Sequence, residues 1–68
     1  MGECVSFSLQ GKNYEALAKI EDGKVVLSRL LREDPKKFNV WDDVIWEYRA
    51  NKGFQIDVDE EIYEALEM

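Results

Sequence analysis

Hydrophobic and polar residues alternate along the first half of the chain. The segment VSFSL places Val5, Phe7 and Leu9 on one side and two serines on the other. The segments NYEALAKI and KVVLS repeat this alternation, with apolar residues at every second position. A period of two is typical of a strand that buries one face. We therefore predict three consecutive strands.

Two glycine-containing dipeptides separate these strands. Asp22-Gly23 suits a two-residue hairpin loop, because both residues of the favoured turn need positive φ. Gly11-Lys12 suits a turn that has glycine first. These loops place all the apolar positions on one face of an antiparallel meander. The expected pairs are Val5–Ala18, Phe7–Ala16, Leu9–Tyr14, Ala18–Leu27 and Ile20–Val25.

The segment NVWDDVIWEYRANKG has the spacing of an amphipathic helix. Asp34-Pro35 and Asn39 are alternative N-terminal caps, and Lys52 followed by Gly53 is a typical helix end. We predict a helix near residues 39–52 that covers the sheet above the small side chains of the middle strand. Its apolar positions are Phe38, Trp41, Val44, Ile45 and Tyr48.

The last segment, FQIDVDEEIYEALEM, has the pattern of a strand followed by a short helix. Phe54, Ile56 and Val58 alternate with polar residues, and Asp59 can cap the helix that follows. The expected order is β-β-β-α-β-α, an α+β fold in a single domain of residues 1–68. The strand at 54–58 either joins the sheet at an edge or pairs with another chain.

Charge restricts the partners that the chain can bind. Of the 68 residues, 46% are hydrophobic and the net charge is −6. Residues 38–68 carry two basic and nine acidic side chains, so this half would repel a phosphate backbone. We expect no nucleic-acid partner. No apolar run approaches the ~20 residues of a membrane span, so we expect no membrane partner either.

The residues of common catalytic sites are scarce. The chain has no histidine, which excludes Ser-His and Cys-His pairs, and no glycine-rich phosphate-binding motif. Cys4 is the only cysteine, so no intrachain disulfide can form, and we expect a cytoplasmic protein. We predict no enzyme activity, no cofactor and no metal.

Two acidic segments contain carboxylates that could serve as metal ligands. Asp42, Asp43 and Glu47 would share part of the predicted helix surface, but adjacent aspartates project about 100° apart, which favours a solvated face. DVDEEIYEALEM has acidic residues at the first, third and fifth positions of a calcium loop. It has Ile62 and Met68 where that loop needs glycine and glutamate.

The segment FQIDV running into DEEIYEAL resembles the strand and first helix of ribbon-helix-helix antitoxins. That resemblance implies a DNA-binding strand followed by two helices. Here only one helix is predicted after the strand, and Asp57 would place a carboxylate near phosphates. The pattern is shared by many strand-to-helix junctions and does not establish membership of the family.

Trp46 lies about 140° around the predicted helix from Trp41, outside the apolar stripe. It either contacts another chain or is covered by the C-terminal helix or by Arg49. We expect a small acidic, non-enzymatic interaction module whose partner is another protein or, as a homodimer, a second copy. The alternatives are an antitoxin-type or regulatory partner that binds a basic target surface and a carboxylate-metal enzyme. The candidate interaction residues are Asp42, Asp43, Trp46, Phe54 and Ile56.

Overall fold

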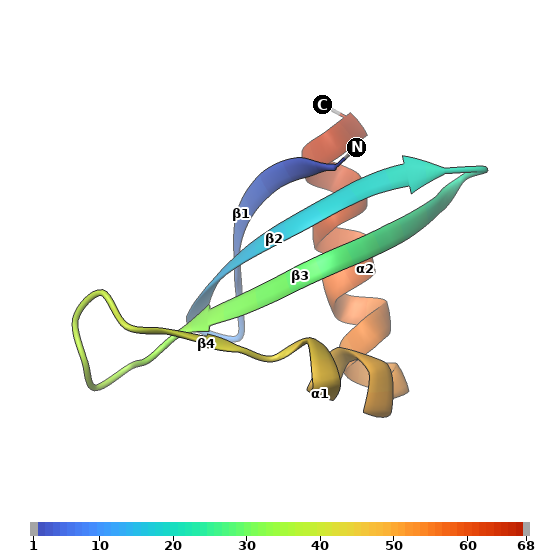
Figure 1. The fold of residues 1–68 in the computed structure, drawn as a ribbon. Coiled ribbons are helices and arrows are strands. Elements are labelled where there is room, and N and C mark those ends of the chain that lie inside the picture. Colours follow the sequence, from blue (N-terminus) through green and yellow to red (C-terminus); the bar gives the residue numbers. More distant parts are fainter. Residues whose placement is uncertain (1, 68) are drawn as a thin grey trace.

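The chain folds into a four-stranded antiparallel sheet with two helices, which confirms the α+β class (Figure 1). The computed structural model describes residues 2–67. The strands follow one another in space in the order β1-β2-β3-β4. The elements are β1 (Glu3–Leu9), β2 (Lys12–Glu21), β3 (Lys24–Glu33), β4 (Trp41–Asp43), α1 (Ile45–Ala50) and α2 (Lys52–Glu67).

The β2–β3 hairpin has the predicted loop. Asp22 and Gly23 have φ values of 53° and 74°, the positive values that a two-residue loop of this kind requires. The pairs Ile20–Val25 and Ala18–Leu27 form as expected.

The β1–β2 loop lies one residue earlier than predicted. Gln10 and Gly11, with φ values of 52° and 76°, form the turn, so Leu9 pairs with Lys12. Phe7 therefore pairs with Tyr14 instead of Ala16. This change moves each partner by two positions, and a shift of two keeps every side chain on its original face. The prediction of one apolar face was right although the register was wrong.

A β-bulge in β3 brings Leu30 into the core. Ala18 pairs with Leu27, but Leu17 pairs with Arg29, so Ser28 is an extra residue in β3. Beyond the bulge, Leu30 pairs with Ala16 and is completely buried. Without the bulge, strict alternation from Leu27 would have placed Leu30 on the open face.

The predicted helix near 39–52 forms only over Ile45–Ala50, and the predicted strand at 54–58 is wrong. Residues 41–43 form β4, which pairs with the end of β3, and α1 starts only at Ile45. Residues 54–58 lie inside α2, which begins at Lys52 rather than following a helix that ends there. Phe54, Val58 and Ile62 are four residues apart and lie on one side of α2, because a helix brings such residues together.

The core lies between the sheet and α2, which crosses one face of the sheet (Figure 1). The small side chains of Ala16 and Ala18 in β2 are buried beneath it, as we expected for a covering helix, although that helix is α2. The opposite face of the sheet carries Leu17 and Val26, each about two-fifths exposed. Within residues 2–67, neither helix has the length and apolar composition needed to cross a membrane.

Candidate functional site

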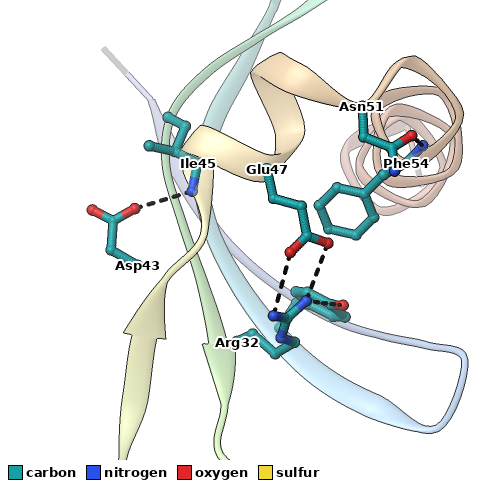
Figure 2. Close-up of polar contacts among 7 residues, drawn as sticks. Arg32, Asp43, Ile45, Glu47, Asn51 and Phe54 are labelled. Atoms are coloured by element: carbon teal, nitrogen blue, oxygen red, sulfur yellow. Dashed lines mark hydrogen bonds and ion pairs between the residues drawn. The ribbon is translucent and has the colours of Figure 1, made fainter.

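Two backbone N–H groups, one at the start of α1 and one at the start of α2, donate to side chains (Figure 2). The Oδ1 atom of Asp43 accepts a hydrogen bond from the backbone N–H of Ile45 at 3.0 Å. The Oδ1 atom of Asn51 accepts one from the N–H of Phe54 at 3.1 Å, at the start of α2. Each bond satisfies a backbone donor that the beginning of a helix leaves unpaired.

Glu47 pairs with Arg32 across the gap between α1 and β3 (Figure 2). The guanidinium of Arg32 donates to both carboxylate oxygens at 3.4 Å and to the hydroxyl of Tyr14 at 3.4 Å. The hydrogen bond with Tyr14, followed by the interaction with Glu47, raises the pKa of Arg32 against the opposing effect of burial. This cluster holds α1 against β2 and β3.

The candidate carboxylates Asp42, Asp43 and Glu47 do not share a helix surface as predicted. Asp42 and Asp43 belong to β4, and Glu47 in α1 is engaged by Arg32. In the described part of the chain, no group of three or more acidic or thiol side chains is placed to hold a metal ion. The calcium-loop segment lies in α2, apart from Met68, which is outside the described residues.

Tyr48 joins α1 to α2. Its hydroxyl donates a hydrogen bond of 2.5 Å to the Oδ1 atom of Asp59. Burial raises the pKa of Tyr48 well above its ordinary value, and the hydrogen bond and negative charge of Asp59 add to this rise. Tyr48 therefore remains a neutral hydrogen-bond donor at neutral pH.

The five candidate interaction residues differ in their exposure. Trp46 and Ile56 point outward and are 64% and 51% exposed, so neither α2 nor Arg49 covers Trp46 as one alternative required. Phe54 is half-buried, and its ring centroid lies 5.9 Å from that of Tyr14. The segment that resembled an antitoxin strand is helical, which removes the strand on which that resemblance depended.

The most exposed large hydrophobic side chain among residues 2–67 was not predicted to be exposed. Phe38 is 96% exposed in the loop at 34–40 between β3 and β4. Two hydrogen bonds of 2.8 Å hold this loop: Asp34 N–H donates to the Val40 carbonyl, and Lys36 N–H donates to Asp34 Oδ1. Asn39 adopts a φ of 62°, a conformation that asparagine tolerates well. Asp34-Pro35 therefore begins a turn and does not cap a helix as predicted.

Comparisons of the chain with protein-family models, curated proteins and solved structures gave no match.

Proposed function

We propose that this chain is a non-enzymatic protein–protein interaction module that acts in the cytoplasm. The observation that carries the proposal is the exposure of two aromatic side chains, Phe38 at 96% and Trp46 at 64%. Large aromatic side chains are enriched among the residues that dominate binding energy at protein interfaces. The core of the chain is formed without either of them.

The β3–β4 loop is suited to present an anchor residue. Its two hydrogen bonds fix the backbone on both sides of Phe38, so less conformational entropy is lost when a partner covers the ring. Lys36 and Lys37 precede Phe38 in the same loop. A partner with an apolar pocket and an acidic rim would bury the ring of Phe38 and attract these two lysines.

Charge and redox chemistry support the choice of partner and compartment. The acidic residues of the second half of the chain favour a protein partner over nucleic acid, because phosphates would be repelled. Cys4 is a free, exposed thiol, which a reducing compartment would preserve. The partner can be another protein or a second copy of the chain.

Site-specific photocrosslinking in cells tests the proposal. A benzoylphenylalanine residue replaces Phe38 or Trp46 in separate variants, and Leu17 on the open sheet face serves as the matched control position. We expect discrete adducts of defined mass at positions 38 or 46 and not at 17. If the folded chain gives no adduct at either aromatic position, the proposed interaction surface is wrong.

Self-association requires a separate measurement. Residues 54–58, which as a strand could have paired with a second copy, are helical, so the homodimer now depends on the exposed aromatic residues. Sedimentation at increasing concentration should show a dimer in the wild type that Trp46→Ala or Phe38→Ser abolishes. A constant mass near 8.0 kDa would exclude the homodimer and leave a different protein as the partner.

One observation favours the alternative function, a regulatory partner that covers a basic target surface. The helix α2 carries six carboxylates and a single lysine, Lys52. A surface of this charge would steer a basic partner toward the chain and suppress acidic ones. Titration with a basic protein at two salt concentrations would detect such steering as a salt-dependent association rate.

A further inference from the structure

Within residues 2–67, the strand β1 lies at one edge of the sheet and hydrogen-bonds only to β2. Leu9 and Lys12 flank the two-residue loop and form a hydrogen-bonded pair, as a turn of this kind requires. In an antiparallel ladder, hydrogen-bonded and non-hydrogen-bonded pairs alternate. The N–H and C=O groups of Cys4, Ser6 and Ser8 therefore point away from β2, toward the open edge.

Most of the usual protections of an edge strand are missing from β1, whose one charged residue is Glu3. Natural edge strands are kept from pairing with other chains by short length, lysine or proline residues, or bulges. β1 is seven residues long, contains no lysine or proline, and pairs with β2 without a register shift. The other edge strand, β4, has only three residues, and two of them are Asp42 and Asp43.

A shallow groove of about 430 Å³ lies between β1 and α2. Phe7 supplies a half-buried apolar surface to this groove, and Ala65 supplies a small exposed one. Glu61 and Glu64 line it from α2 and are half-buried and exposed, respectively. No hydrogen bond or ion pair within residues 2–67 engages either carboxylate. The groove therefore combines unpaired backbone groups with two free negative charges.

We propose that the free edge of β1 binds an extended basic segment of a partner protein as an added β-strand. Strand addition satisfies the outward N–H and C=O groups of Cys4, Ser6 and Ser8, and these backbone bonds provide affinity without sequence preference. Side chains of an extended segment alternate between two faces. Those that face α2 meet Glu61 and Glu64, so lysine or arginine at every second position provides the specificity.

The negative charge of the groove favours a basic segment over a second copy of the chain. Antiparallel pairing of two β1 strands would bring the two acidic grooves toward each other. Glu61 and Glu64 of both copies would then face like charges, and each chain carries a net charge of −6. A basic segment replaces this repulsion with attraction.

The groove is a different site from the exposed aromatic residues of the proposed function. Phe38 lies in the β3–β4 loop and Trp46 in α1, whereas the groove belongs to β1 and α2. The inference therefore adds a second binding surface. Trp46→Ala and Phe38→Ser should leave binding at the β1 edge unchanged, which separates a failure of one proposal from a failure of the other.

A peptide titration monitored by NMR tests the inference. The probe is a seven-residue peptide of alternating lysine and threonine, blocked at both ends, and the matched control replaces lysine with glutamate. We expect saturable binding of the lysine peptide, with the amide protons of Cys4, Ser6 and Ser8 becoming protected from exchange. The glutamate peptide should not bind.

Two further comparisons separate strand addition from general charge attraction. A lysine peptide with N-methyl groups on alternate amides keeps its charge but cannot complete the ladder, and we expect it to lose at least about tenfold in affinity. Glu61→Gln with Glu64→Gln should weaken the unmodified peptide by about tenfold at low salt. The control pair is Glu60→Gln with Glu67→Gln, which line other hollows of the surface and should leave the affinity unchanged.

Three results would overturn the inference. Equal affinity for the methylated and unmodified peptides would exclude strand addition, and an unchanged affinity after the Glu61 and Glu64 substitutions would exclude the acidic groove. Protection of the Ser6 and Ser8 amides in a concentration-dependent dimer of the free chain would assign the edge to a second copy. Ser6→Pro, which removes one outward N–H at a position where an edge strand tolerates proline, should abolish binding while the circular dichroism of the chain is retained.

Discussion

The two isoleucines of α2 provide a matched test of the fold. Ile62 is completely buried against the sheet, whereas Ile56 is 51% exposed on the same helix. Ile62→Ala removes about three buried carbon groups at about 0.8 kcal/mol each and leaves a cavity, so we expect a loss of about 2–4 kcal/mol. A domain of this length has a free energy of unfolding of about 3–10 kcal/mol, so the loss is a large fraction of the total. Ile56→Ala should change stability by no more than about 0.5 kcal/mol, because the better helix propensity of alanine offsets the small loss of burial.

Urea unfolding followed by tryptophan fluorescence and circular dichroism measures both variants. The free energy of unfolding in water is compared between variants whose slope of free energy against urea concentration equals that of the wild type. An unchanged slope means that the difference is one of stability alone. If residues 54–58 formed a strand with Ile56 facing the sheet, Ile56→Ala would cost as much as Ile62→Ala. Equal losses in the two variants would therefore refute the helix and its orientation.

Two other predictions concern α1, α2 and the hairpin loop. The raised pKa of Tyr48 means that its contribution is fully present below its ordinary pKa of about 10 and is lost as the pH rises above that value. Tyr48→Phe should lower the free energy of unfolding by about 1–2 kcal/mol at neutral pH. The variant should also lose less stability than the wild type between pH 7 and pH 11, which chemical unfolding at these two pH values measures. An equal loss in the two proteins would argue against this role of Tyr48. Gly53→Ala in α2 should stabilise the chain by about 0.5–1 kcal/mol, whereas Gly23→Ala at a φ of 74° should destabilise it by about 1 kcal/mol or more. Thermal unfolding of the pair would show shifts of opposite sign, and a stabilised Gly23→Ala would contradict the loop geometry.

The first half of the fold was predictable because its interactions are local. The Asp22-Gly23 loop requires positive φ at both positions, and this requirement alone fixes the β2–β3 register near the turn. Gly11 left two choices, since it can be the first or the second residue of a turn. The structure uses it as the second, with Gln10 in front.

The second half was misread because its apolar residues satisfy two periods. Phe54, Ile56 and Val58 alternate as in a strand, but Phe54 and Val58 also begin a series at every fourth residue that continues through Ile62 and Leu66. The longer series buries more apolar surface against the sheet and determines the structure. Ile56 is not part of this series, and the helix leaves it 51% exposed.

The segment that became β4 was misread for a different reason, because its structure depends on a distant strand. The alternation in KVVLS ends at Ser28, which the bulge turns into an extra residue, and β3 then continues to Glu33. That continuation offers unpaired backbone groups, and Trp41–Asp43 pairs with them. The local pattern of Trp41 and Val44 suggested a helix, but it contained no information about the length of β3.

The edge position of β1 likewise cannot be read from its own residues. A fourth strand placed beside β1 would have covered the N–H and C=O groups of Ser6 and Ser8, and a strand at 54–58 could have done so. Because the fourth strand pairs with β3, it covers the opposite edge and leaves β1 open. Because residues 54–58 are helical, the carboxylates of Glu61 and Glu64 lie along that open edge. The corrections to the fold thus create the acidic groove, and the proposed strand-binding site depends on both of them.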